Sequence, residues 1–238
     1  MPTKQLERAV PAAGPASEGQ PRGDLDLILR LIPRGAHVLD LGCGDGLLLQ
    51  RLRREKGADG RGVERHPEAL LACIRRGIPV FQGDLDEGLA DFPDKSFDVV
   101  VISHTLQQVS QPRRLLREAG RVGRQVIVGF PNFGHWEIRF GLLLRGRMPK
   151  SPMLPYEWYD TPNIHLLTLA DFEEFCRREG LRVEQRLALR YPTWRPVRFC
   201  AGWLAAYALY LLDARDFHPA PVAPPAAAPE EEIAVVEE

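Results

Sequence analysis

Residues 37–46 read HVLDLGCGDG, and this stretch decides the fold of the chain. The apolar run Val38 to Leu41 predicts a buried strand, and the leucine-rich segment that begins at Leu47 predicts a helix. Three glycines spaced by two lie between them, and glycine permits a tight turn whose backbone can approach a ligand. A strand, a glycine-rich turn and a helix form the first unit of a doubly wound α/β sheet, in which ligands bind at the carboxyl ends of the strands.

Two kinds of ligand compete for this turn. A dinucleotide site has the pattern G-x-G-x-x-G, but the position of its third glycine holds Leu47. The pattern here, D-x-G-x-G-x-G, carries two carboxylates, Asp40 and Asp45, which would repel a pyrophosphate and suit a cationic ligand. S-adenosylmethionine has a sulfonium and an ammonium group and no phosphate. The turn therefore favours S-adenosylmethionine, or its product S-adenosylhomocysteine, over NAD; the other alternative is a turn without a ligand.

Acidic residues also end the next two predicted strands. Glu64 ends the strand 61–64, 24 residues after Asp40, where a carboxylate can accept hydrogen bonds from both ribose hydroxyls. Asp84 and Leu85 follow the strand 79–82, where they could hold the amino group and the ring face of an adenine. Three acids at three successive strand ends predict a nucleoside cofactor.

The remaining pattern completes the α/β alternation. Asp24 is the expected cap of a first helix with apolar positions at Leu25, Ile28 and Leu29. A β-branched run, 96–103, predicts a buried parallel strand that ends at Ser103, with His104 beside the cofactor site. Further helices are expected at 112–120 and 171–179, and further strands at 125–130 and 181–184. Residues 203–212 could form a helix or a last strand, and a strand at 207–212 is favoured because it would complete the sheet.

A long aromatic and basic insertion, residues 131–167, separates the fifth strand from the next helix. Segments of this length usually cover an active face or bind something. Its candidate substrate or partner residues are His135, Trp136, Tyr156, Trp158 and His165. With Arg139, Arg145 and Arg147 they have the composition of an interface, and the alternatives are a lid or contact with a membrane surface.

Composition bounds the chain to one domain. Its 238 residues are 45% hydrophobic and 26% charged, enough for one α/β core at 23–212 between disordered segments at 1–22 and 213–238. Seven acids and one arginine lie from Asp213 onward, so the rest has only a mild basic excess, which excludes a nucleic-acid binder. Four scattered cysteines predict no metal site, and the apolar stretch 199–212 is too short for stable membrane insertion. We expect a soluble cytoplasmic protein.

Several motifs together resemble the methionine biosynthesis protein MetW family over residues 22–212. They are VLDLGCGDG, GVE, QGDLDEGLADFPDKSFDVVVIS, TLQ, GFPNFGHW, LLLRGRMP and LPYEWYDTPNIHL. The resemblance implies a class I S-adenosylmethionine-dependent methyltransferase fold, with a mostly parallel, seven-stranded sheet. It also implies association with homoserine O-acyltransferase. Cofactor roles follow for Asp40, Gly42, Gly44, Glu64, Asp84 and Leu85, and we place Asp45 and Ser103 beside them.

Two functions follow from this resemblance. The first is a cofactor-binding partner that supports homoserine O-acyltransferase. The second is a working methyltransferase on an unknown small molecule, for which positioning supplies most of the catalysis and a base is needed only for a protonated nucleophile. The candidate bases are His104, His135, Tyr156 and His165, and no catalytic residue is assigned. A NAD-dependent reductase is disfavoured by Leu47 and by the acidic turn.

Overall fold

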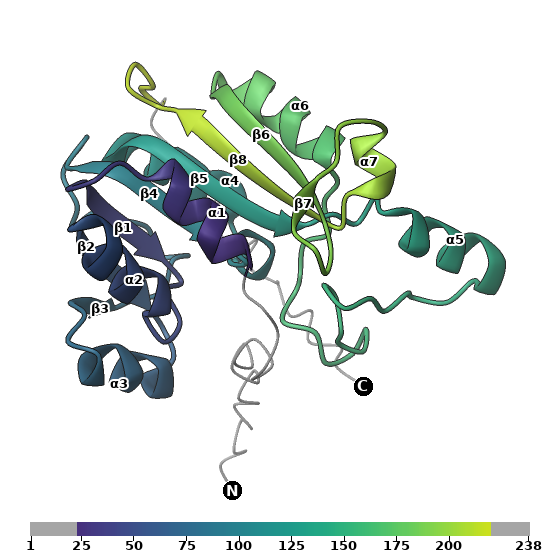
Figure 1. The fold of residues 1–238 in the computed structure, drawn as a ribbon, viewed down its shortest axis with the longest axis horizontal. Coiled ribbons are helices and arrows are strands. Elements are labelled where there is room, and N and C mark those ends of the chain that lie inside the picture. The colour runs from purple at the N-terminus through teal and green to yellow at the C-terminus, as the bar shows by residue number, and fades with distance from the viewer. Residues whose placement is uncertain (1–22, 220–238) are drawn as a thin grey trace, which may run out of the picture.

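A single sheet, in the order β3-β2-β1-β4-β5-β8-β6-β7, runs through the centre of the molecule (Figure 1). The computed structural model describes residues 23–219. The strands are β1 (His37–Leu41), β2 (Asp59–Glu64), β3 (Val80–Gln82), β4 (Phe97–Ser103), β5 (Gly123–Pro131), β6 (Arg182–Arg190), β7 (Arg195–Pro196) and β8 (Tyr207–Asp213). The first five strands are parallel, and β8 is antiparallel to both β5 and β6. The predicted doubly wound, mostly parallel sheet is confirmed.

The sheet has eight strands where seven were expected. The additional strand is β7, a two-residue segment that pairs with Leu189 and Arg190 at the end of β6. Such a short strand has no periodicity to reveal it in a sequence. The strand expected at 207–212 is present as β8, and the strand expected at 181–184 extends to Arg190.

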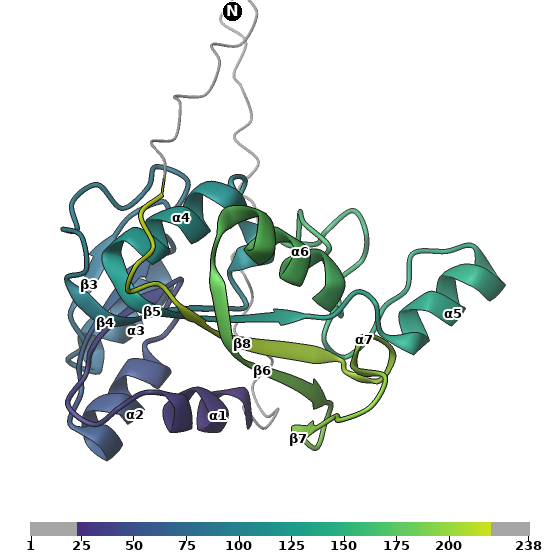
Figure 2. The ribbon, with the colours of Figure 1, turned by 90° about the horizontal axis from the view of Figure 1, so that it is seen from above.

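Helices cover both faces of the sheet (Figure 2). They are α1 (Gly23–Leu31), α2 (Leu47–Lys56), α3 (Pro67–Arg75), η1 (Leu106–Gln108), α4 (Pro112–Val122), α5 (Trp136–Arg145), α6 (Leu169–Glu179) and α7 (Ala201–Leu204). On one face, α1, α2 and α3 bury Ile28, Leu52 and Cys73 against the sheet. On the other face, α4 and α6 bury Leu116 and Phe172. The two apolar layers leave the strand ends as the place for polar side chains.

Two boundaries differ from the expectations. Asp24 does not precede the first helix: α1 begins at Gly23, and Asp24 lies in its first turn with its side chain fully buried.

The segment expected to be disordered from residue 213 is ordered at its start. Lys95 Nζ donates hydrogen bonds to the carbonyl oxygens of Ala214 and Phe217, and Ala214 is buried. Residues 1–22 and 220–238 lie outside the described part of the chain, so those two expectations stay predictions.

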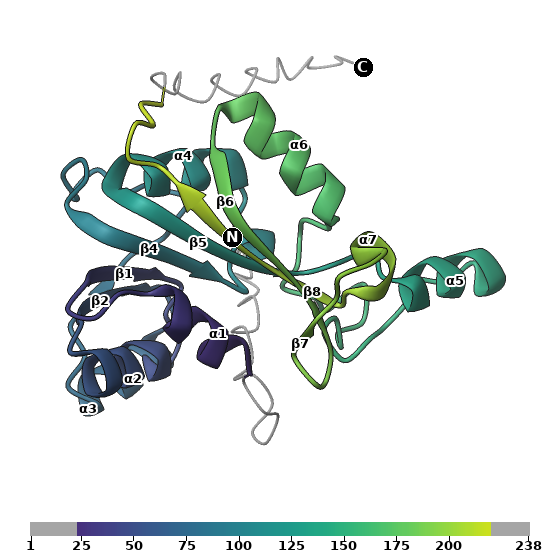
Figure 3. The ribbon, with the colours of Figure 1, turned by 45° about the horizontal axis from the view of Figure 1, so that its top comes forward.

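The insertion contributes a helix that stands away from the body. In Figure 3, α5 projects beyond the end of the sheet, on the side where β5 ends and β8 begins. Ile138 is the one buried residue of its ten. Within residues 23–219, no helix has the length and apolar content needed to cross a membrane.

Candidate functional site

The glycine turn between β1 and α2 lies at the carboxyl edge of the sheet, next to the end of β4. Gly42 has a φ of +75°, and a Cβ at this position would overlap the side chain of Thr105, which follows β4. Gly44 has a φ of +55°, and a Cβ there would meet nothing within 4 Å. The first glycine is therefore required by packing inside the protein, and the second leaves open space above the backbone. That space fits a ligand held close to the turn.

Glu64, at the end of β2, is tied into this turn. Its Oε2 accepts a hydrogen bond from the Gly44 N–H at 2.9 Å. Its Oε1 accepts from the N–H groups of Arg65 and His66, at 2.8 and 2.9 Å, and lies 2.9 Å from His66 Nδ1. Glu64 as a whole residue is 7% exposed. Glu64 therefore organises the turn as well as offering its remaining lone pairs at the strand end.

The other predicted cofactor residues have different environments. Asp40 is buried at the end of β1. Asp84 is partly exposed after β3 and lies 3.5 Å from the guanidinium of Arg65, while Leu85 is buried in the core. Because β3, β2 and β1 are neighbours, the sheet brings Asp40, Glu64 and Asp84 to one edge. These side chains and the space at Gly44 fit an adenosyl cofactor.

Asp45 has a partner within the protein. Its Oδ2 accepts from Arg76 Nη2 at 2.6 Å, and its Oδ1 accepts from the Leu47 N–H at 3.2 Å. The arginine offsets the negative charge that was expected to favour a cation. Both hydrogen bonds are made within the protein, so the direct role of this carboxylate is to hold the turn.

Ser103 and His104 lie at the carboxyl end of β4 and contact β8 and α1. The Ser103 hydroxyl lies 3.2 Å from the Tyr207 hydroxyl, and the His104 ring stacks on the Tyr207 ring at 4.7 Å between centroids. His104 Nε2 lies 3.5 Å from a carboxylate oxygen of Asp24. His104 also has a φ of +59°. This backbone conformation is uncommon outside glycine, and residues that adopt it are often found at functional sites. Asp24 was not among the predicted site residues, because its position suggested only a helix cap.

Two cysteines pack under the turn. Cys43 Sγ lies 3.8 Å from Cys73 Sγ of α3, and Cys73 Sγ donates to the Gly44 carbonyl oxygen at 3.1 Å. The hydrogen bond to Cys73, together with burial, raises the pKa of Cys43. Both thiols are buried, and they fix the turn against α3.

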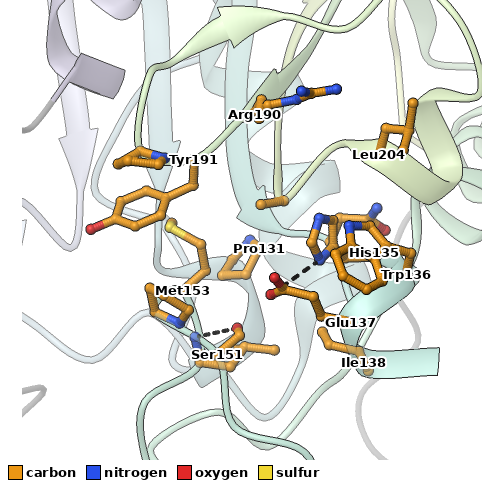
Figure 4. A pocket seen from close by; sticks show the side chains of 15 residues that line it. Pro131, His135, Trp136, Glu137, Ile138, Ser151, Met153, Arg190, Tyr191 and Leu204 are labelled. Carbon is orange, nitrogen blue, oxygen red and sulfur yellow. Dashed lines mark hydrogen bonds and ion pairs between the residues drawn. The ribbon is translucent and has the colours of Figure 1, made fainter. Parts of the chain in front are cut away.

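A second feature at the same edge is a pocket of about 450 Å³ (Figure 4). It lies where β5 and β6 end and where α5 and β8 begin. His135 and Trp136 line it, together with Glu137, Met153 and Arg190. Burial lowers the pKa of His135, the positive charge of Arg190 lowers it further, and Glu137 opposes this shift. His135 is therefore neutral at neutral pH.

The remaining predicted residues of the insertion are dispersed. Trp158 is largely exposed and packs edge-on against Tyr159, and Tyr156 is less exposed. The His165 backbone N–H donates to the Gln107 carbonyl oxygen at 3.0 Å, which brings the end of the insertion to η1, just after β4. The structure therefore brings His104 and His165 to the same loop region and places His135 and Trp136 in the pocket.

Comparisons with known proteins agree with this architecture. The family model described as "Methionine biosynthesis protein MetW" matches residues 22–212. A relative from Rhodopirellula baltica, "Bifunctional methionine biosynthesis protein MetXA/MetW", is 39% identical over 173 residues, which cover 69% of this chain and 28% of that protein. The chain thus spans little more than a quarter of that relative. A "Ubiquinone biosynthesis O-methyltransferase" from Xanthomonas axonopodis is 28% identical over 174 residues, 70% of this chain and 71% of that protein.

Solved structures show the same fold at low identity. The Haloferax volcanii complex between the Trm112 methyltransferase activator and a putative methyltransferase aligns with a TM-score of 0.59 and 18% identity, covering 79% of this chain and 88% of the other. An S-adenosylmethionine-dependent methyltransferase from Mesorhizobium loti aligns with a TM-score of 0.58 and 19% identity, covering 79% and 99%. The fold is that of S-adenosylmethionine-dependent methyltransferases.

Proposed function

Because the chain belongs to the methionine biosynthesis protein MetW family, we propose that it binds S-adenosylmethionine or S-adenosylhomocysteine and acts with homoserine O-acyltransferase in the cytoplasm. The observation that carries this proposal is the relative in which a MetXA and a MetW part are joined in one chain. Two parts that are fused in one organism commonly work side by side where they are separate chains.

The cofactor half of the proposal rests on the carboxyl edge of β1, β2 and β3. Gly44 leaves space for the ligand, Glu64 would accept from the ribose, and Asp84 with Leu85 would hold the adenine. Asp40 would face the positive end of the cofactor. S-adenosylmethionine supplies an activated methyl group when bound, whereas S-adenosylhomocysteine has none.

The partner half rests on the exposed side chains of α5. We define the α5 surface as Trp136, Phe140, Leu142, Leu143, Leu144 and the following Met148. Leu143 and Leu144 are 76% and 77% exposed, and large apolar residues gathered on one projecting element mark interaction sites. Arg139 is held over the Trp203 ring at 4.5 Å to the centroid, so a cation and an aromatic ring stand next to this surface. Arginine and aromatic residues dominate binding hot spots.

The test is the affinity of purified homoserine O-acyltransferase for the full chain, measured by calorimetry. The double variant Leu143→Ser/Leu144→Ser should weaken binding by roughly thirtyfold or more, the usual cost of losing a hot spot. A matched control is Leu71→Ser/Ile74→Ser on α3, where the exposed fractions are 51% and 57%. This control should bind normally, because α3 lies at the other end of the sheet (Figure 1).

The insertion aromatics refine the location of the interface. Trp158→Ala or Tyr156→Ala should also lower the affinity for the acyltransferase while cofactor binding survives. If both variants bind the acyltransferase normally and lose the sulfur cofactor, the insertion is an active-site lid, and a working methyltransferase becomes the better account. Equal loss in the α3 control would contradict the assignment of α5.

A further inference from the structure

Apart from Trp136, which also belongs to the α5 surface, the residues that line the pocket at the foot of α5 have no role in the function proposed above. It shares no residue with the cofactor turn, and its volume of about 450 Å³ lies within the range of small-molecule sites. Both sites lie at the carboxyl edge of the sheet, the cofactor turn after β1 and the pocket after β5 and β6. It is therefore a separate candidate binding site.

The pocket is held in shape by hydrogen bonds within the protein. Asn132 Nδ2 donates to the carbonyl oxygens of Ala205 and Gly202, at 2.7 and 3.2 Å, and Asn132 Oδ1 accepts from the Gly134 N–H at 2.9 Å. On the opposite wall, Ser151 and Leu154 exchange backbone hydrogen bonds of 3.1 and 2.9 Å. The polar groups of these wall residues are therefore hydrogen-bonded within the protein, and these bonds hold the pocket in shape.

The pocket has two charged residues, Arg190 and Glu137, and they do not form an ion pair with each other. The two residues lie on opposite sides of the pocket (Figure 4). Within residues 23–219, Arg190 forms no ion pair with any carboxylate. Glu137 lies 3.8 Å from His135, whose pKa is lowered by burial, so that ring brings no positive charge at neutral pH.

Most of the remaining lining is apolar. The lining also includes Ile138, Met153, Leu154, Tyr191 and Leu204. An apolar pocket with a few placed polar groups fixes a ligand by its charges and gains affinity from its hydrocarbon part. A guanidinium pairs best with a carboxylate, and a glutamate pairs with an ammonium group.

We propose that this pocket binds a small zwitterion, an α-amino acid with an apolar side chain. The carboxylate would pair with Arg190, the ammonium group with Glu137, and the side chain would pack against Met153 and Leu154. Both charged residues are exposed, so a ligand can reach them from solvent. The proposal does not depend on the acyltransferase or on the sulfur cofactor.

Three probes that share one hydrocarbon chain test the proposal by calorimetry on the full chain. L-Norleucine carries both charges, hexanoate lacks the ammonium group, and n-pentylamine lacks the carboxylate. We expect norleucine to bind roughly tenfold or more tightly than either single-charge probe, because each charged hydrogen bond contributes about that factor.

Two variants assign the charges. Arg190→Gln should weaken norleucine roughly tenfold or more and leave pentylamine unchanged, and Glu137→Gln should reduce norleucine to the affinity of hexanoate. Arg195→Gln is the matched control, since Arg195 is an exposed arginine of the neighbouring strand that does not line the pocket. Circular dichroism verifies that each variant is folded.

Three results would overturn the proposal. They are no heat from norleucine at millimolar concentration, equal binding of norleucine and hexanoate by the unmodified protein, and normal norleucine binding by Arg190→Gln. None of these results bears on docking of the acyltransferase or on binding of the sulfur cofactor, so this proposal and the proposed function fail separately.

Discussion

The turn after β1 and the helix after β5 stand at the same edge of one sheet, yet they are built in opposite ways. At the turn, Glu64 accepts from four nitrogen donors and Gly42 packs against Thr105. In α5, by contrast, one residue of ten is buried, and Leu143 and Leu144 face solvent. The turn is stabilised by hydrogen bonds and packing within the protein, whereas α5 contributes little to the core. Changes at the turn should therefore alter stability, and changes in α5 should alter binding.

The largest effect is expected at Gly42. Gly42→Ala should lower the free energy of unfolding by about 3 kcal/mol or more, because a non-glycine residue at positive φ costs about 1–3 kcal/mol and overlap with Thr105 adds a similar amount. Urea denaturation measures it. Gly44→Ala is the control, because Gly44 also has a positive φ but a Cβ there would meet no neighbouring atom. This variant should lower the free energy of unfolding by only about 1 kcal/mol. It should also weaken cofactor binding, because the methyl group would enter the space left for the ligand. Equal destabilisation by both variants would remove the packing argument.

A smaller loss is expected at Glu64. In Glu64→Gln, one carboxylate oxygen becomes an NH₂ group that must face a backbone N–H, of Gly44 or of residues 65 and 66. Leaving a buried donor without an acceptor costs about 1–3 kcal/mol. The free energy of unfolding, measured by urea denaturation, should therefore fall by about 2 kcal/mol. The cofactor affinity, measured by calorimetry, should fall as well. Glu87→Gln, at an exposed position, should change neither. Loss of cofactor binding at full stability would mean that Glu64 serves the ligand alone.

His135 links the α5 region to pH. Burial holds the pKa of His135 below its ordinary value, so between that lowered pKa and about 6.5 the unfolded chain binds more protons than the folded chain. Stability therefore falls as the pH drops from 7.5 to 5.5. His135→Gln should lose less stability over this interval than the unmodified protein does, as measured by melting temperature. An identical pH dependence in the two proteins would show that the histidine is solvated.

The smallest effect on stability is expected in α5 itself. Leu144→Ser should change the free energy of unfolding by less than about 0.5 kcal/mol, because an exposed leucine loses no buried contact. Leu49→Ser on α2 is the contrast, since Leu49 is buried and its loss should destabilise the protein by several kcal/mol. Comparable losses in the two variants would mean that α5 packs against the body in solution.

Much of the turn was predictable from the sequence, because its residues are close together in the chain. The order of strands and glycines predicted β1, α2 and the edge at which Glu64 and Asp84 lie. The hydrogen bonds of Glu64 were not predictable, since they depend on how far the turn folds back over β2.

The pocket and α5, at the same edge, depend on contacts between distant segments. Arg190 and Glu137 are 53 residues apart, and the end of β6 and the start of α5 meet only in the folded protein. Asp24 and His104 are similarly remote in the sequence, so a residue expected as a helix cap lies instead beside a histidine that was predicted for the site. The projection of α5 away from the body was not predictable from the sequence either, because its run of leucines is equally typical of a buried helix.

The direction of β8 has a practical consequence for measuring these interactions. Tyr207 pairs with Pro131 at the carboxyl edge, and Asp213 pairs with Gln125 near the start of β5, so β8 carries the chain to the opposite edge. Lys95 fastens it there through Ala214 and Phe217. Gly23, by contrast, lies against Trp194, next to the end of β6. A fluorophore or a biotin attached at the exposed residue Asp216 would therefore leave the cofactor turn, the pocket and α5 accessible, whereas the same label near Gly23 would crowd them.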